Sequence, residues 1–499
     1  MVHRFNLSSG VLFFNLLWSS VSFLHAGNRI SLTLENAVEI AMSHSYQIRR
    51  LELGIERSTS WLQARKAGLK SHVSVDLRSP DLKQISDTRW NSALYRDEIV
   101  RLNSQLWQSQ LSIRQPVILF GYPTNGFISL NYNLYRYAQQ EASGYDIDYY
   151  NRLFIKFEQP FFLPNKLKND LEVAEANLKD VRLNYLSERM VIMNDIASDY
   201  YDAFEYAYLN IIFNRQIGIL DSVHEVVFRV AEVTNNRRRD PIQLRLEIAH
   251  MRENLLENQG RLRMKLANLK QKLNLDIRDS LYINPVLTVQ PASIDLDQAI
   301  HYGFTLNPWL RRLAIWKRKS EIDLENIRGH DAFHMRLEMT YGLEKSNHSF
   351  SNIWMGYDNS NSVTLKAYLP VWDWGRRRYQ IDAERRGLEQ RMIDIEERED
   401  IIRKSVINAY TNLMEYSARF YNMQESLELA EEVTVIGLDD YRRGETSFQE
   451  LLQMITRRKE TETKLLEAYL GYKRACLELT VQTYYDFEKG MTIQEALDF

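Results

Sequence analysis

Few residues in this chain have the types and spacing that catalysis or metal binding requires. His330 and His334 are four residues apart, which on a helix would direct both rings toward one metal ion. An alternating pattern begins at His334, so we expect a strand there and no metal site. Cys476 is the single cysteine, and we expect it to pack in a helix. Because the chain has no phosphate-binding, zinc-protease or nucleophile-elbow motif, we predict that it is not an enzyme and needs no cofactor.

Charge and composition argue against several other classes of protein. The 499 residues carry 63 basic and 66 acidic side chains, and the net charge of −3 gives no reason to expect a nucleic-acid partner. The mean hydropathy of −0.41 is too low for a bundle of membrane-spanning helices. Residues 1–26 have the layout of a secretory signal, with basic Arg4, an apolar stretch from Val11 and small residues up to Ala26. We therefore expect export from the cytoplasm.

Two long segments, 165–236 and 376–443, are predicted to be helices. Neither contains a proline, and both are rich in residues that favour helices. Apolar residues recur at spacings of three, four and seven, as from Ile402 through Val406 and Ala409 to Leu413. This pattern is typical of a coiled coil, and at 1.5 Å per residue each helix would be on the order of 100 Å long. Shorter helices are expected over 35–70, 241–273, 297–328 and 448–484.

Other segments alternate apolar and polar residues with the period of a half-buried strand. They lie at 73–77, 153–157, 333–342 and 362–370. A soluble sheet would give the same alternation, but the strand length and the aromatic residues at the strand ends favour a membrane barrel. The residues expected to form a membrane-interface girdle are Phe161, Phe162, Trp372 and Trp374.

The sequence contains an internal duplication. Residues 31–40 resemble residues 293–302, and both copies continue through strands into a long helix, a turn and a second helix. The expected divisions are a first repeat at 27–275, a linker at 276–292, a second repeat at 293–484 and a C-terminal tail at 485–499. The first repeat is longer because residues 79–148 are inserted between its strands, and this insert contains a predicted hairpin over 109–137.

Four strands per chain cannot close a membrane barrel, because the smallest such barrels have about eight strands. Unpaired strand edges in lipid cost several kcal/mol for each backbone group, so we expect the sheet to close with other copies of the chain. Three copies would contribute twelve strands around a water-filled lumen. Whether the hairpin of the insert joins this barrel is left open by the sequence. The predicted fold is therefore mainly α with membrane β, in which long antiparallel coiled coils form a tunnel below a barrel shared by the trimer.

The chain resembles the TolC-like outer membrane factors, the outer membrane efflux protein family. The resemblance covers about residues 30–485 and rests on the order of the repeat openings, Leu34–Ile40 and Leu296–Tyr302, the strand exit Leu369–Arg378, and the helix turns near 237–243 and 441–452. It implies a homotrimeric duct in the outer membrane that extends into the periplasm. Such a duct passively conducts substrates of efflux or type I secretion from an inner-membrane pump of the RND or ABC type, through a periplasmic adaptor.

The resemblance also implies roles for residues in the two helix turns. One set corresponds to the periplasmic aperture of the family: Glu450, Gln453, Tyr441 and Gln243. A second set corresponds to the region where the adaptor docks: Arg237, Arg238, Arg239, Asp240, Arg442, Arg443, Gly444 and Thr446.

Two other protein classes are compatible with parts of the sequence. A structural coiled-coil scaffold would account for the heptads, but not for the alternating strands or the signal segment. A periplasmic adaptor, or membrane-fusion protein, carries one helical hairpin between small β domains, whereas this chain contains two hairpin units. The outer-membrane duct accounts for more of the sequence than either alternative.

Overall fold

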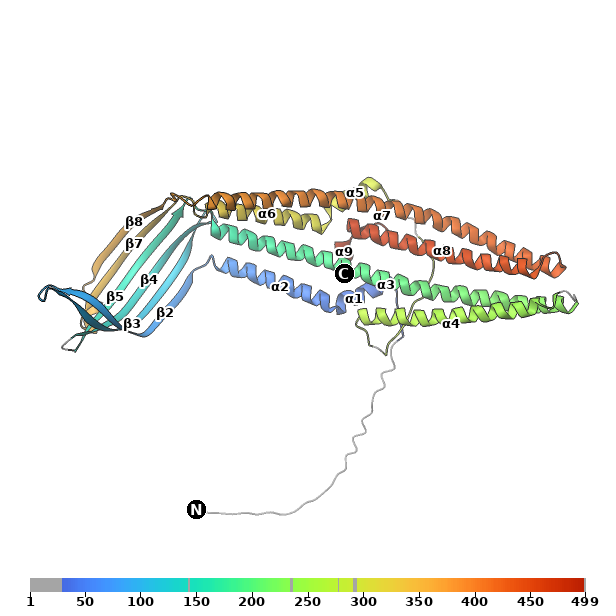
Figure 1. Cartoon of the computed structure of the whole chain (residues 1–499), viewed down its shortest axis with the longest axis horizontal. Helices are drawn as coiled ribbons and strands as arrows, with labels where there is room; N and C mark the ends of the chain where they lie inside the picture. The colour runs from blue at the N-terminus through green and yellow to red at the C-terminus, as the bar shows by residue number, and fades with distance from the viewer. Residues whose placement is uncertain (1–28, 142–143, 234–236, 277, 290–293, 498–499) are drawn as a thin grey trace, which may run out of the picture. The chain divides into compact units, whose positions relative to one another are not determined.

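The computed structural model describes residues 29–141, 144–233, 237–276, 278–289 and 294–497 (Figure 1). The expected signal segment, residues 1–26, lies outside the described residues. The chain divides into two compact units, one formed by residues up to 41 together with 199–286, the other by residues 42–198 together with 287–499. Among the residues that are described, no helix is both long and apolar enough to cross a bilayer.

The first unit contains a helical hairpin. Its first helix is the part of α3 (Lys166–Val233) that follows residue 198, and its second is α4 (Asp240–Lys272). The Lys265 ammonium lies 2.7 Å from the Asp202 carboxylate, and the Asn258 side-chain amide donates to the Tyr206 carbonyl at 2.8 Å. These contacts join the two helices in the half of the hairpin that is away from the connecting turn.

A small sheet and the beginning of α1 (Leu34–His44) complete the first unit. β1 (Arg29–Ser31) pairs in parallel with β6 (Ser280–Tyr282), so that the start of the first repeat lies beside the linker that follows α4.

The second unit contains a six-stranded antiparallel sheet with the strand order β2-β3-β4-β5-β7-β8. The strands lie side by side in Figure 1, and β2 and β8 form the edges of the described sheet. Their bounds are β2 (His72–Asn91), β3 (Arg96–Leu119), β4 (Tyr122–Glu141), β5 (Gly144–Phe161), β7 (His334–Asn347) and β8 (Asp358–Tyr368).

The described sheet has six strands, not the four expected per chain. The predicted hairpin at 109–137 forms β3 and β4, which pair with β2 on one side and β5 on the other. Phe120 and Gly121 connect them with φ of 51° and 82°, the left-handed geometry that a tight two-residue hairpin loop requires. The two strands occupy interior positions of the sheet because their backbone groups find hydrogen-bond partners on both sides.

Besides the part of α3 up to residue 198, the described residues of the second unit form six complete α-helices. The stretches expected as single helices over 35–70 and 297–328 are each interrupted. Ser45 caps α2 by accepting from the Gln47 amide at 3.2 Å, and Asn307 caps α6 by accepting from the Trp309 amide at 2.9 Å. The bounds are α2 (Tyr46–Ala67), α5 (Leu296–Thr305), α6 (Pro308–Gly329), α7 (Arg376–Arg443), α8 (Phe448–Thr483) and α9 (Ile493–Leu497).

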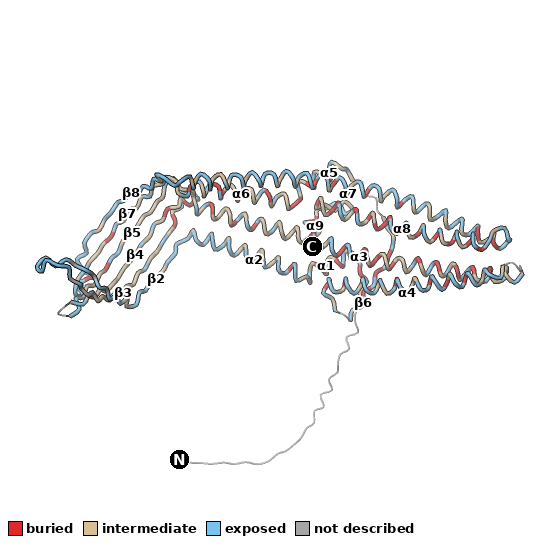
Figure 2. Tube along the Cα trace, in the orientation of Figure 1, coloured by how far each residue is buried: buried red, intermediate tan, exposed pale blue. Residues whose placement is uncertain are grey.

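The core of the second unit lies between α5, α7 and α8. Its buried members are small and aliphatic residues with Tyr472: Ala299, Ile402, Val406, Ala409, Leu413, Ala475 and Leu479. Figure 2 shows buried residues along the part of α7 and α8 that is far from the sheet. Residues 376–401, the part of α7 next to the sheet, contain none. The short strands β9 (Tyr485–Asp486) and β10 (Met491–Thr492) pair after α8.

Candidate functional site

The register of the sheet places apolar side chains from neighbouring strands on one face. One rung across the sheet consists of Val73, Ile113, Leu130, Ile155 and Tyr341. Val73 and Tyr341 are both 59% exposed and Ile155 is 49% exposed, although β5 is an interior strand. An apolar face of this extent on a single chain marks a surface that a partner or a lipid covers.

The opposite face of the same strands is mainly polar, with Phe154 as an apolar member of the rung that contains Asn131. The rung next to the apolar one contains Ser74, Ser112 and Asn131, and the Ser112 hydroxyl donates to the Asn131 side-chain carbonyl at 2.8 Å. Further along, Arg152 of β5 lies 2.9 Å from Glu344 of β7. Since side chains alternate between the faces of a strand, the sheet has one face suited to lipid and one suited to water.

The four residues expected to form a girdle lie at the end of the sheet where the helices join. Phe161 ends β5 and Phe162 follows it, and Trp372 and Trp374 precede α7; the four are 42%, 69%, 75% and 85% exposed. The rings of the two tryptophans meet edge to face with centroids 5.6 Å apart. Exposed aromatic side chains at the junction of a sheet with helices are typical of a membrane interface.

Asp373 fixes the chain between the two tryptophans. Its carboxylate accepts from the Gly375 amide at 2.9 Å and from the Arg377 amide at 3.0 Å, which begins α7. These backbone hydrogen bonds lower the pKa of Asp373, so the carboxylate is ionised at neutral pH. The tryptophan pair is thus attached to a capped helix end.

A second aromatic cluster at the other end of the sheet was not predicted from the sequence. Tyr149 of β5 meets Phe350 at 5.5 Å, and Phe350 meets Trp354 at 5.7 Å, within the short 3-10 helix η2 (Phe350–Trp354). The signal was available, because three aromatic residues, Phe350, Trp354 and Tyr357, occur in the connection between two alternating segments.

The spacing of the two aromatic clusters matches the thickness of a membrane. Tyr149 and Phe161 stand twelve residues apart on β5, which at about 3.3 Å per residue is about 40 Å along the strand. A strand tilted by about 45° covers about 28 Å along the membrane normal over that length, close to the roughly 30 Å of a hydrocarbon core.

The turn between α7 and α8 is closed by two complementary caps. Gly444 has φ of 83°, and the Glu445 amide donates to the Asp440 carbonyl at 2.9 Å, so α7 ends in a Schellman motif. α8 begins with a capping box formed by Ser447 and Glu450. Tyr441 is fully buried in this turn, with its ring centroid 6.0 Å from that of Phe448.

Glu450 makes local hydrogen bonds in this turn. Its carboxylate accepts from the Thr446 hydroxyl at 2.6 Å and from the Ser447 amide at 2.8 Å. These hydrogen bonds lower the pKa of Glu450, with the Thr446 hydroxyl as the largest cause. The structure thus brings Tyr441, Thr446 and Glu450 into one capped turn. Gln453 follows on α8 with an exposed side chain.

The arginines of the second turn lie close to acidic residues. Arg442 lies 2.9 Å from Asp439, and Arg443 forms an ion pair with Asp440 and lies 3.4 Å from Glu445. This turn therefore presents a locally neutralised surface rather than a basic patch.

The first turn, in the first unit, has a different charge balance. Arg237, Arg238 and Arg239 precede Asp240, which opens α4, and the side chains of Arg238 and Arg239 are exposed. The Arg239 carbonyl accepts from the Gln243 amide at 3.0 Å, so Gln243 lies in the first turn of α4 with an exposed side chain. Three arginines and one aspartate leave this turn positively charged.

Comparisons with solved structures identify the architecture. The chain superposes on the outer-membrane channel OprN with a TM-score of 0.64 at 12% identity, covering 90% of this chain and 89% of that chain. The outer membrane protein VceC from Vibrio cholerae gives a TM-score of 0.60 at 13% identity, covering 90% and 95%. The open state of the Neisseria gonorrhoeae MtrE outer membrane channel gives 0.58 at 12% identity, covering 90% and 88%. The chain has the fold of an outer-membrane channel.

This channel fold is not accompanied by detectable sequence similarity. No protein-family model matches the chain, and no curated protein matches its sequence. The likeness in structure extends over nine-tenths of the chain, so the channel fold includes both the sheet and the long helices.

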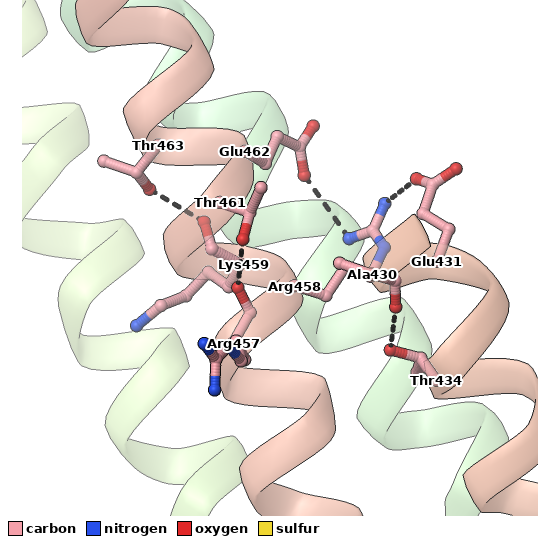
Figure 3. A network of polar contacts seen from close by, with 9 residues as sticks. All are labelled: Ala430, Glu431, Thr434, Arg457, Arg458, Lys459, Thr461, Glu462 and Thr463. Atoms are coloured by element: carbon pink, nitrogen blue, oxygen red, sulfur yellow. Dashed lines mark hydrogen bonds and ion pairs between the residues drawn. The ribbon is translucent and has the colours of Figure 1, made fainter. Parts of the chain in front are cut away.

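The long helices α7 and α8 contain a buried cluster of charged residues that the sequence did not indicate. Arg458 of α8 lies 2.6 Å from Glu431 of α7 and 3.3 Å from Glu462, one turn along its own helix (Figure 3). The side chains of Arg458 and Glu462 are only 6% and 0% exposed. Alternating charges on a long helix resemble a solvated face, so only packing reveals that these two are buried.

Near the aromatic cluster of Tyr149, Phe350 and Trp354, His348 lies beside two aspartates. Its Nδ1 is 3.0 Å from an Asp148 oxygen and 3.5 Å from an Asp146 oxygen. Among the described residues this is a set of ligand types close enough for a metal ion, but His348 is 75% exposed and already engaged with both carboxylates. His330 and His334, by contrast, lie at the end of α6 and the start of β7.

Proposed function

We propose that this protein is the outer-membrane exit duct of a tripartite efflux or type I secretion system. The observation that carries the proposal is the two-faced sheet, whose apolar face is bounded by aromatic clusters about one membrane thickness apart. The long helices joined to the inner end of this sheet would extend the duct into the periplasm. The fold shared with outer-membrane channels supports the same function.

The surface of the single chain supports assembly into a homotrimer. The part of α7 next to the sheet, residues 376–401, buries none of its side chains. Along α7 from residue 393, several exposed apolar residues are separated by multiples of seven, the spacing of a coiled-coil seam. They are Ile393, Ile407, Met414, Tyr421 and Val435. A neighbouring copy would cover this seam, and its sheet would pair with the edge strands β2 and β8.

The function is tested by locating and reconstituting the full chain. We expect it to fractionate with outer membranes, to purify in detergent as three copies, and to conduct ions in planar lipid bilayers. A single-copy protein that is released with the periplasmic contents and conducts no current would contradict the proposal. The scaffold and adaptor alternatives predict that second outcome.

Glu450 is proposed to add negative charge to the periplasmic aperture, and Tyr441, Gln453 and Gln243 are proposed as further aperture residues. Glu450→Gln should raise the cation concentration that half-blocks single channels severalfold, because the lowered pKa keeps this carboxylate ionised. Glutamine can still complete the capping box, so the turn keeps its shape. Glu445→Gln, which neutralises an exposed acid of the same turn, is the matched control. Equal block in both variants would remove Glu450 from the aperture.

The adaptor is proposed to dock on the two helix turns, with an inner-membrane pump of the RND or ABC type behind it. The docking residues are those of the first turn, Arg237 to Asp240, and of the second, Arg442, Arg443, Gly444 and Thr446. The first turn, with three arginines and one aspartate, is expected to contribute electrostatic attraction to an acidic partner.

Reversal of charge in the first turn tests the docking proposal. Arg238→Glu combined with Arg239→Glu should reduce the yield of complexes crosslinked to inner-membrane proteins at least tenfold, because it repels an acidic partner. Channel conductance should not change. Arg252→Glu, at an exposed position further along α4, is the control. Undiminished crosslinking by the double variant would refute docking at this turn.

A further inference from the structure

The β3–β4 hairpin occupies interior positions of the sheet, between β2 and β5. β3 pairs with β2 from Arg114 opposite His72 to Arg96 opposite Asn91. β4 pairs with β5 from Phe127 opposite Glu158 to Glu141 opposite Gly144. The hairpin cannot leave the sheet without separating β2 from the other strands. It is therefore a structural part of the sheet and not a loop attached to its end.

The side chains of the hairpin continue both faces of the sheet. Ile113 and Leu130 extend the apolar rung from Val73 to Ile155, while Ser112 and Asn131 extend the polar rung beside it. β3 has 24 residues and β4 has 20, more than the 9–11 residues that a strand needs to cross a membrane. Both strands thus have the length and the alternation of membrane-spanning wall strands.

Two additional strands per copy change the width of the enclosed space. Strands spaced by about 4.8 Å and tilted by about 45° give a wall about 26 Å in diameter for twelve strands and about 39 Å for eighteen. Inward side chains of about 5 Å on each side leave a lumen of about 16 Å or about 29 Å, respectively. An α-helix with its side chains is about 10–12 Å across, so only the wider lumen admits two helices side by side.

We propose that β3 and β4 are wall strands of the duct and that its membrane-spanning part admits a macromolecular cargo, a polypeptide about two helices wide. The inference rests on the proposed function, since it needs three copies of the six-stranded sheet to close into one wall of eighteen strands. The cargo class follows from the width, because a lumen of about 16 Å would pass small solutes and a single extended or helical chain.

Single cysteines on β4 test the placement of the hairpin in the wall. Leu130→Cys and Ser129→Cys are adjacent residues on opposite faces of one strand. In liposomes, a fluorophore at residue 130 should be quenched by lipid-attached nitroxides, and one at residue 129 by a water-soluble quencher. The native Cys476 should not react, because burial raises its pKa to about 12. Quenching of both positions by the water-soluble reagent alone would overturn the proposal.

Removal of the hairpin tests the width. Replacing residues 86–143 with Asn-Gly would join β2 to β5 by a two-residue loop, with Lys83 opposite Asp146 and Val73 opposite Ile155 on the apolar face. The largest polyethylene glycol that enters the channel from the sheet side should decrease in hydrodynamic diameter by nearly half. An unchanged cut-off in a conducting trimer overturns the inference alone, whereas a full-length chain without trimers or conductance overturns the proposed function as well.

Discussion

Val73→Lys is expected to abolish stable insertion of the sheet, and Ser74→Lys is expected to leave insertion nearly unchanged. The two residues are adjacent on β2, but Val73 belongs to the apolar rung that contains Ile155. A lysine facing lipid costs up to about 2–4 kcal/mol, the cost being largest at the membrane midplane. Three copies carry this cost together, whereas a lysine at residue 74 faces water.

The comparison is read from membrane fractions and from the detergent-purified protein. The Val73→Lys variant should be depleted from outer membranes at least tenfold and should yield few trimers on native gels. Equal recovery of the two variants would mean that the apolar face does not contact lipid, and it would contradict the membrane placement of this sheet.

Arg458→Met is expected to lower the thermal stability of the α7–α8 hairpin strongly. Arg458 is 6% exposed and bridges Glu431 and Glu462, so the substitution leaves the fully buried Glu462 carboxylate without the Arg458 guanidinium. Removing one partner from a buried ion pair costs about 3–5 kcal/mol. The midpoint of helix loss, followed by circular dichroism, should fall by roughly 10 °C.

Two other variants distinguish the stability cost of burying an unpaired charge from the cost of losing an ion pair. Glu431→Gln should have a small effect, below about 1 kcal/mol, because the Glu431 side chain is 48% exposed. Arg458→Met combined with Glu462→Gln should recover much of the stability lost by the single variant, since it no longer buries a charge. A similar loss for Glu431→Gln and Arg458→Met would show that burial does not determine the cost.

Much of the helical part could be predicted from sequence because its signals are local. The recurrence of apolar residues around Val406, together with the absence of proline, is sufficient to indicate a long helix. The helix breaks before Tyr46 and Pro308 were overlooked, although Ser45 and Asn307 are typical capping residues. The helical spacing of apolar residues continues through both breaks, so the spacing alone predicts one continuous helix in each case.

The candidate site was predicted only in part, because several of its features depend on contacts between distant segments. The girdle residues, such as Phe161 and Trp372, could be named because they adjoin strand ends. Phe350 and Trp354 lie within a connection, and only the contact between Phe350 and Tyr149 of β5 shows that they form a cluster. Glu450 was proposed from family resemblance, and the structure adds its role in the capping box. The burial of Arg458 depends on how α7 packs against α8.

The sequence by itself determined the type of each element, the internal duplication, and which residues of a strand share a face, because these depend on periods of two, three and four residues along the chain. Only the tertiary structure decided that the sheet has six strands and that one apolar rung continues from Val73 to Tyr341. Alternation indicates which residues of a strand share a face, but it does not indicate which strands lie next to it. Those neighbours are fixed by hydrogen bonds between residues up to about two hundred positions apart, as between β5 and β7.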